Sequence, residues 1–337
     1  TAEHKLQIGI ALLRGNMDGE AAGHALRHVA DVVLAELLAH VTAEFESQHG
    51  RIRNAKVALL GFGRLGSREL ALESDLDLVL VFECPPNAGQ SNGARPLTPG
   101  LYFSRLCQRF INAVTAMTGE GRLYEVDMRL RPSGSAGPIA IGFDAFAEYQ
   151  RREAWTWEHM ALTRARVVYG AEQDRAAVAA IIDEVLHRER EPAGLRTDIA
   201  KMRADIREHK PAAGLLDVKL IDGGLIDLEF VVHFHQLDVC EGLSPHLPEA
   251  IDGLVRAGQL PAQLSDAHDL LTRMLVTLRL VAPRAAAEED LSEWVRALIA
   301  KACGLSDWPA LWDAYAKART LVTSLWSDIV SEEVSPE

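Results

Sequence analysis

The sequence is poor in several features that would each place it in a narrow class. It has 4 cysteines in 337 residues, spaced too far apart for a zinc site or a disulfide scaffold, so we expect buried, reduced thiols at Cys84, Cys107, Cys240 and Cys303. No apolar run reaches the roughly 18 residues of a membrane span and no signal-peptide pattern is present, so we expect a cytoplasmic protein without a membrane partner. Positive charge is in deficit, and the net charge of −13 argues against a nucleic-acid partner.

The remaining composition is that of an ordinary globular protein. Hydrophobic residues make up 48% of the chain and charged residues 25%. At about 100 to 200 residues per domain, the length allows two or three domains with full cores. The chain begins at Thr1 in a helical pattern, without a methionine, so we expect a piece of a longer protein.

Hydrophobic periodicity predicts a mixed core followed by helices. A helix is expected over 20–46, and strands over 56–60, 76–82 and 123–131. The Pro- and Gly-rich segment 84–100 is expected to be a long loop, either a lid or disordered. After residue 134 the pattern is helical, with helices at 144–168, 197–209 and 225–239 and short strand-like runs near 139–141 and 217–221. The predicted fold class is α+β, a mixed α/β core with a small mixed sheet, plus a C-terminal all-α helical bundle.

The most informative segment is 56–82, in which an apolar run and a glycine-serine turn precede Ser74-Asp75-Leu76-Asp77. Asp75 and Asp77 are two apart at the start of a strand, so they point to the same face and can share a cation. The glycines before them leave backbone N–H groups free at a helix N-terminus, which favours an anion such as phosphate. The pattern predicts a nucleotide site with a divalent metal, unless both aspartates are simply solvated.

The glycines of 61–66 also fit the dinucleotide-binding fingerprint. A Rossmann unit needs a crossover of about a dozen residues and an acidic residue about 20 residues beyond the glycines. Only seven residues, 67–73, separate the turn from Ser74, which is enough for about two helical turns. The spacing therefore counts against a dinucleotide fold.

The run 123–131 alternates between apolar and charged side chains. Its polar face carries Glu125, Asp127, Arg129 and Arg131, which is costly inside a core unless these groups line a cleft or form surface ion pairs. If this strand lies beside the strand that follows Asp75, Asp127 completes a cluster of three carboxylates. Such a cluster suits Mg²⁺ and in-line displacement at phosphorus, with Asp127 placed to accept a proton.

Four motifs in this order resemble the bacterial glutamine synthetase adenylyltransferase family, within the polymerase-β-type nucleotidyltransferase superfamily. The motifs occupy 61–78, 124–134, 153–168 and 219–230, and the resemblance runs from about Val57 to Leu237. The segments 130–134 and 153–159 are similar to those of the C-terminal, adenylylating half of such enzymes. Because Ser-Asp-x-Asp occurs once, we expect the other half to be missing.

The resemblance implies that AMP moves from ATP to a tyrosine hydroxyl of glutamine synthetase, with release of diphosphate. Asp75 and Asp77 would hold both Mg²⁺ ions, Asp127 would hold one, and Gly66 and Ser67 would hold the triphosphate. Further candidates for contact with the nucleotide, among which the sequence does not choose, are Gly63, Arg129, Arg131, Arg164, Arg166 and Lys219. The implied domains are an N-terminal helical segment at 1–50, a catalytic domain at 51–170 and a helical bundle at 171–337.

Two other readings stay open within the same family. The chain could be the phosphorolytic half, which releases ADP from the modified tyrosine, or a silent half that senses nucleotide. Retention of all three aspartates argues against a silent half. The resemblance also implies regulation by glutamine and a PII-type nitrogen signal protein.

Weaker candidates have structural explanations that we favour. Asp227, after a double glycine, is expected to interact with the first turn of a helix. The pair His233 and His235 faces two directions on a helix, and the pair His24 and His28 has no supporting carboxylate pattern. Stacking of adenine on Trp155 or Trp157 is possible, but we expect both rings in the core.

Overall fold

The computed structural model describes residues 1–14, 16, 17, 19–71, 74–119 and 121–331. It divides into two compact units. The sheet unit comprises Thr1–Gly9 and Ala22–His187, and the helical unit comprises Ile10–Ala21 and Arg188–Glu337. The domain ranges expected from the sequence stay a prediction. Within the described residues, no helix has the length and apolar character needed to cross a membrane.

The sheet unit is built on a small mixed sheet. β1 (Lys56–Gly61) pairs antiparallel along its whole length with residues 78–83 of β2 (Leu76–Glu83), and β7 (Arg166–Tyr169) pairs antiparallel with β1. On the other edge of β2, β5 (Val126–Asp127) and β6 (Ala140–Gly142) both run parallel to it, one beyond the other. The strands expected at 56–60 and 76–82 are confirmed.

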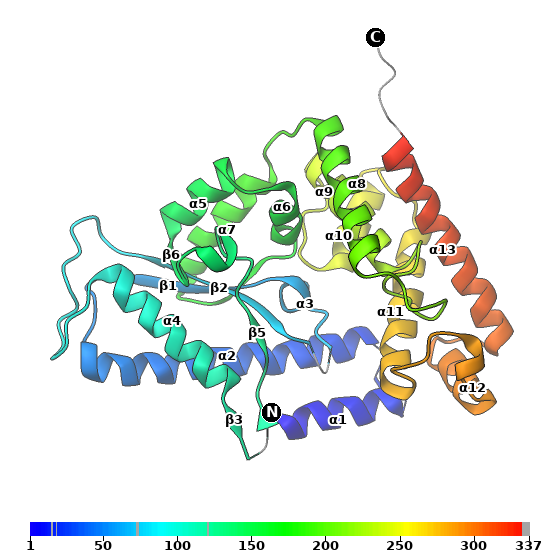
Figure 1. Cartoon of the computed structure of the whole chain (residues 1–337), viewed down its shortest axis with the longest axis horizontal. Coiled ribbons are helices and arrows are strands. Elements are labelled where there is room, and N and C mark those ends of the chain that lie inside the picture. The colour runs from blue at the N-terminus through cyan, green and yellow to red at the C-terminus, as the bar shows by residue number, and fades with distance from the viewer. Residues whose placement is uncertain (15, 18, 72–73, 120, 332–337) are drawn as a thin grey trace, which may run out of the picture. The chain divides into compact units, whose positions relative to one another are not determined.

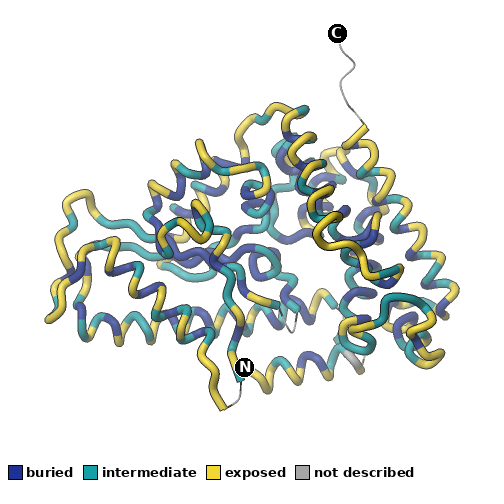
Figure 2. Tube along the Cα trace, viewed as in Figure 1, coloured by how far each residue is buried: buried dark blue, intermediate teal, exposed yellow. Residues whose placement is uncertain are grey.

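Helices cover both faces of this sheet. Figure 1 shows α5 (Phe143–Arg152) and α7 (Glu172–Leu186) on one side, and α2 (Gly19–His49) and α4 (Pro99–Thr115) on the other. The central strands are therefore buried on both faces, as the dark tube in Figure 2 shows. Continuous apolar runs in β1 and β2 are the expected consequence of such double burial. The other elements of this unit are α3 (Gly63–Gly66), β3 (Met117–Thr118), β4 (Gly121–Arg122), η1 (Gly134–Ala136) and α6 (Thr156–Leu162). The helix α1 (Ala2–Leu13) begins in it.

Three expectations about secondary structure are wrong. The strand expected over 123–131 is reduced to Val126–Asp127, because the chain turns from residue 129 onward, where the amide of Arg131 bonds the carbonyl of Met128 at 3.3 Å. The single helix expected over 144–168 is two helices, α5 and α6, which break at 153–155 and end at Leu162, and its β-branched tail forms β7. The run 217–221 forms turns.

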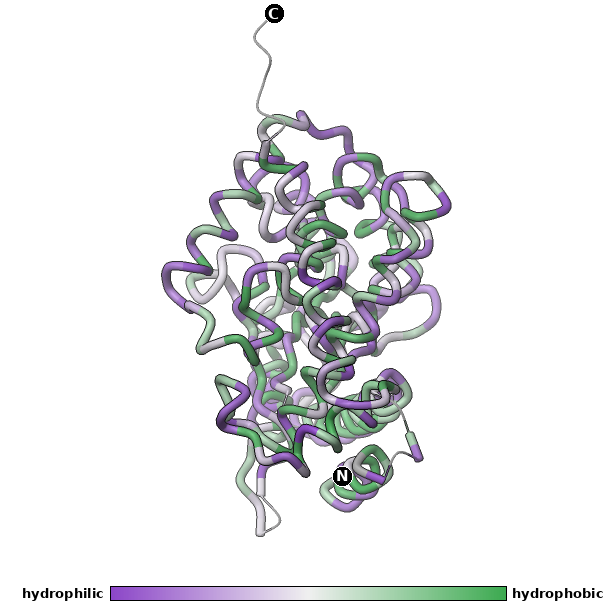
Figure 3. The backbone as a smooth tube through the Cα atoms, turned by 90° about the vertical axis from the view of Figure 1, so that its right-hand side faces the viewer, coloured by the Kyte–Doolittle hydropathy of each residue, from purple (hydrophilic) through white to green (hydrophobic). Residues whose placement is uncertain are grey.

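The helical unit is organised around α9 (Leu225–Val239), which is buried on almost every side. A helix that is apolar all round is expected at the centre of a bundle. Helices α8 (Pro192–His209), α10 (Leu247–Arg256), α11 (Gln263–Val281) and α13 (Trp308–Ser331) pack against it, while η2 (Glu288–Asp290) and α12 (Glu293–Ala302) complete the unit. In Figure 3, hydrophobic and hydrophilic segments alternate along the helices, as amphipathic packing requires. An α+β core with a helical bundle is thus confirmed.

The cysteines and the two tryptophans differ partly from expectation. All four cysteines are free, but only Cys107 and Cys303 are buried. Trp155 is 70% exposed and Trp157 41%, so neither ring belongs to the core. The expectation is wrong because Trp155 precedes the short helix α6, whose buried side consists of Glu158, Met160 and Leu162.

Candidate active site

The carboxylates singled out by the sequence come together where β2 begins. Asp77 pairs in register with Asp127 across the parallel strands β2 and β5. Neighbouring strands are about 4.8 Å apart, so the two side chains leave the sheet close to one another. Asp75 precedes β2, two residues from Asp77, and alternation directs it to the same face. The amide of Leu76 donates to the carbonyl of Glu125 at 2.9 Å and fixes this register.

The three carboxylates repel one another, and this repulsion contributes to a raised pKa of Asp77. Burial, together with the charges of Asp75 and Asp127, raises the pKa of Asp77 from an ordinary 3.8 to about 6, although Arg164 and Arg129 oppose the shift. The pKa of Asp127 is lowered instead, chiefly by its hydrogen bonds with Arg129. A divalent cation would relieve this repulsion, so the donor set fits one.

In this structure the side chain of Arg129 forms an ion pair with the carboxylate of Asp127. Its Nε donates to both carboxylate oxygens of Asp127, at 3.1 and 2.8 Å, and its backbone amide donates at 2.8 Å. Among the described residues, the oxygens of Asp75, Asp77 and Asp127 are not all within 4.8 Å of one another. The Arg129 side chain is 81% exposed, so it can leave Asp127 with little loss of packing. Joint binding of a cation by all three aspartates would require this release.

Gly63 and Gly66 are needed for close approach. Gly63 has φ +52°, and a Cβ there would lie 2.3 Å from Oδ2 of Asp77. A Cβ on Gly66 would lie 1.8 Å from the carbonyl oxygen of Arg164. The turn therefore packs directly against Asp77 and against the segment before β7.

The amides of Gly66 and Ser67 already bond within this turn. They donate to the carbonyls of Phe62 and Gly63, each at 2.9 Å. Ser67 is buried, and its hydroxyl accepts a hydrogen bond from Arg164 at 3.1 Å. Contact of Gly66 and Ser67 with a triphosphate stays a prediction, and in this conformation their own amides are not directed to it.

The four candidate arginines have different surroundings. Arg131 donates to the carbonyls of Met128 and Gly137 and so holds the turn after β5. Arg166 pairs with Asp31 on α2 at 2.8 Å. Arg129 and Arg164 also have partners, Asp127 for the first and Ser67 and Glu69 for the second, but these two arginines in addition lower the pKa of Asp77 by their charge.

Some contacts around the site were not foreseen. The hydroxyl of Tyr149 donates to Glu158 at 2.9 Å, and the amide of Trp155 donates to the same carboxylate. This network ties α5 to α6, immediately before Arg164. Glu158 lies inside the motif 153–168, but its burial has no signal in the sequence.

The other candidates belong to the helical unit or have structural roles. Lys219 lines a pocket of the helical unit. Asp227 forms a buried ion pair with Arg203 and accepts from the amide of Gly223 at 2.6 Å, which is a structural role as expected. His233 is buried and bonds Gln236 at 2.9 Å.

Comparisons with known proteins agree with the motifs. The family model of glutamate-ammonia ligase adenylyltransferase (GlnE) matches residues 1–181, and a second model, GlnD PII-uridylyltransferase, matches residues 199–330. Three curated relatives carry the name bifunctional glutamine synthetase adenylyltransferase/adenylyl-removing enzyme. The relative from Brucella suis biovar 1 (strain 1330) is 41% identical over 322 residues, or 91% of this chain and 32% of its own.

The other two relatives match to a similar degree. The relative from Rhizobium meliloti (strain 1021) is 42% identical over 327 residues, which cover 95% of this chain and 33% of its own. The relative from Mesorhizobium japonicum is 51% identical over 230 residues, or 68% of this chain and 23% of its own. The chain spans about a third of the length of the relatives that it matches over most of its residues. Because the first family model covers more than half of the chain, the chain belongs to the glutamate-ammonia ligase adenylyltransferase family.

Proposed function

We propose that the sheet unit is an Mg²⁺-dependent nucleotidyltransferase that moves AMP from ATP to a tyrosine hydroxyl of glutamine synthetase in the cytoplasm, releasing diphosphate. The observation that carries the proposal is the in-register pairing of Asp77 with Asp127 across β2 and β5. Asp75 lies two residues before Asp77 in the sequence. Family membership and the relatives' printed names supply the reaction class and the protein substrate.

Each aspartate has its own part in the proposed reaction. Asp75, Asp77 and Asp127 would hold Mg²⁺, which when bound supplies positive charge to the oxygens of an in-line displacement at phosphorus. Asp127 takes the proton from the tyrosine hydroxyl, a task for which its pKa is too low while Arg129 is bonded to it. Release of Arg129 therefore both frees a metal ligand and makes Asp127 a better base.

Arg129 and Arg164 are the arginines best placed to contact the phosphates of the nucleotide. Once it leaves Asp127, Arg129 is an exposed guanidinium beside the carboxylates, and guanidinium donors suit phosphate oxygens. Arg164 holds Ser67 at the end of the glycine turn and keeps a positive charge near Asp77. Gly63, Gly66 and Ser67 shape the floor on which the triphosphate would rest.

The phosphorolytic reaction is the second candidate, because the relatives' names include an adenylyl-removing activity. Incubation of the chain with labelled ATP and unmodified glutamine synthetase separates the two. Incorporation of label that needs Mg²⁺ supports the proposal. Phosphate-dependent release of label from modified glutamine synthetase, without incorporation, assigns the chain to the removing reaction.

We also propose that glutamine and a PII-type signal protein regulate the activity. This part rests on the family alone, since no described residue is assigned to either. A change in the rate of label transfer on addition of glutamine to the chain would support it, and an unchanged rate would assign that control to other parts of the longer relatives.

A further inference from the structure

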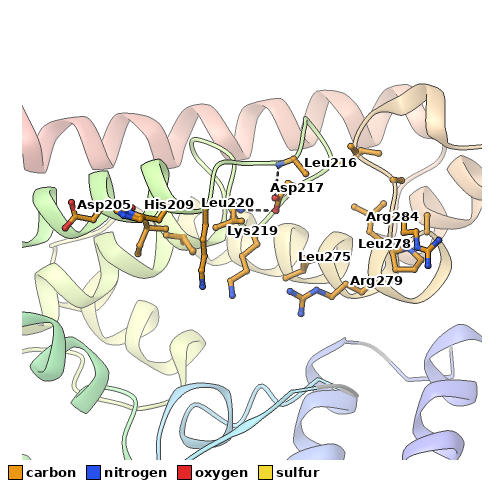
Figure 4. Close-up of a pocket in the computed structure, with 18 residues that line it drawn as sticks. Asp205, His209, Leu216, Asp217, Lys219, Leu220, Leu275, Leu278, Arg279 and Arg284 are labelled. Atoms are coloured by element: carbon orange, nitrogen blue, oxygen red, sulfur yellow. Dashed lines mark hydrogen bonds between the residues drawn. The ribbon is translucent and has the colours of Figure 1, made fainter. Parts of the chain in front are cut away.

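The helical unit contains a large pocket that the proposed reaction does not use. Its volume is about 910 Å³, near the upper end of the range of small-molecule sites. The C-terminal half of α8, the loop before α9 and the C-terminal half of α11 with the segment after it form its walls (Figure 4). All of its lining residues belong to the helical unit.

The walls of the pocket are fixed by bonds that need no ligand. The amide of Leu216 donates to the carbonyl of Ala286 at 3.0 Å, joining the loop to the segment after α11. Asp290 accepts from the amide of Ala286 at 2.8 Å, and the buried Tyr315 donates to the carbonyl of Leu215 at 2.9 Å. A cavity that is already formed loses little free energy to ordering when a ligand enters.

Positive charge dominates the lining in a chain whose net charge is −13. The cations are Lys210, Lys219, Arg279 and Arg284, against two carboxylates, Asp205 and Asp217. The carboxylate of Asp217 already accepts from the amides of Ala213 and Leu220, both at 3.2 Å.

Three of these cations form no ion pair with a carboxylate of the described residues. Within the described part of the chain, no carboxylate lies within 4.0 Å of the charged groups of Lys210, Arg279 or Arg284. In Figure 4 the side chain of Lys219 extends downward from its loop, and the side chain of Arg279 extends sideways with its guanidinium toward Lys219. The pocket therefore presents several cationic donors to one volume.

Large apolar side chains also line the pocket, among them Leu216, Leu220, Ile226, Leu275 and Leu278. A ligand that fits both surfaces joins several negative charges to a body that can lie on leucines. Phosphate oxygens suit Lys and Arg, and a nucleoside supplies a flat, weakly polar body.

We propose that this pocket binds a nucleoside polyphosphate, with its phosphates on the cations and its nucleoside on the leucines. Binding does not depend on the aspartates of the sheet unit or on a divalent metal. Lys219, one of the sequence's candidates for contact with the nucleotide of the transferase reaction, serves this pocket instead.

The test is calorimetric titration of the whole chain with ATP in EDTA at low salt. The chain carrying both Asp75→Asn and Asp77→Asn is titrated in parallel, because it lacks the proposed metal ligands. We expect both proteins to bind ATP equally. Failure of ATP to bind, or loss of binding in the double variant, overturns the proposal.

Charge removal then locates the site. Arg279→Gln with Arg284→Gln should weaken ATP binding about tenfold or more, since hydrogen bonds between charged groups are lost. Both arginines are exposed, so the variant should keep the melting temperature of the parent. Lys301→Gln, at an exposed lysine outside the pocket, is the matched control and should bind as the parent does. Equal weakening by the control overturns the assignment to this pocket.

Inorganic tripolyphosphate tests whether the apolar side chains of the pocket contact the nucleoside. It carries the charges of ATP without a nucleoside, so it should bind the parent chain about tenfold more weakly than ATP if the leucines contact the nucleoside. Equal affinity of tripolyphosphate and ATP would contradict the proposed contact between the leucines and the nucleoside.

Discussion

Replacement of Asp77 by asparagine is expected to stabilise the metal-free chain at neutral pH. The carboxyl of Asp77 has a pKa of about 6 in the folded chain against an ordinary 3.8, because burial and the charges of Asp75 and Asp127 oppose its ionisation. Between these two values the folded state binds more protons than the unfolded state, so stability falls as the pH rises through that window. The loss amounts to about 3 kcal/mol above pH 6, from about 1.4 kcal/mol per pKa unit, and it is absent below pH 4.

The assay is urea unfolding of parent and variant in EDTA, at about pH 7.5 and about pH 4. Asp77→Asn should raise the unfolding free energy by up to about 3 kcal/mol at the higher pH and by little at the lower pH. Asp75→Asn is the matched control; Asp75 is exposed, so its removal should give a smaller gain by relieving Asp77. Millimolar Mg²⁺ should stabilise the parent but not Asp77→Asn. A variant that is less stable than the parent at about pH 7.5, or a gain that does not change with pH, would show that ionised Asp77 does not destabilise the fold.

Three further substitutions test the packing around and beyond the site. Gly66→Ala should cost about 3 kcal/mol of unfolding free energy, because its Cβ would lie 1.8 Å from a backbone carbonyl oxygen, while Gly100→Ala, with nothing within 4 Å, should cost nothing. Equal melting temperatures for these two variants would contradict the packing. Arg203→Met should cost about 3 to 5 kcal/mol by leaving Asp227 buried without its cation, and adding Asp227→Asn should restore part of the loss, as measured by urea unfolding. Trp155→Ala should change the unfolding free energy by less than about 0.5 kcal/mol, since the ring is 70% exposed, and a larger loss in thermal melting would place the ring in a contact.

The strands and carboxylates were predictable where the signal is local. Apolar runs at 56–60 and 76–82 give β1 and β2, and the spacing of Asp75 and Asp77 gives their shared direction. The approach of Asp127 followed from the assumption that its strand lies beside β2, and the pairing bears out that assumption.

Where the sequence-based expectations are wrong, hydrogen bonds and strand pairing with other parts of the chain override the local sequence pattern. The alternation over 123–131 suggested a full strand, but Arg131 bonds the carbonyls of Met128 and Gly137 and turns the chain. The run 166–169 continues a helical pattern, yet its pairing with β1 makes it a strand. The sequence left open whether the polar face of 123–131 lines a cleft or forms ion pairs, and the bond between Arg129 and Asp127 shows an ion pair on it.

Under the proposed function, Asp75 and Asp77 hold the metal through which ATP donates AMP to glutamine synthetase. The most direct measurement is transfer of label from α-labelled ATP to unmodified glutamine synthetase, by the parent chain and by Asp75→Asn, with and without Mg²⁺. We expect label on a tyrosine of glutamine synthetase for the parent with Mg²⁺ only, and a rate at least about a hundredfold lower for Asp75→Asn. Equal transfer by Asp75→Asn, or transfer in EDTA, would contradict it.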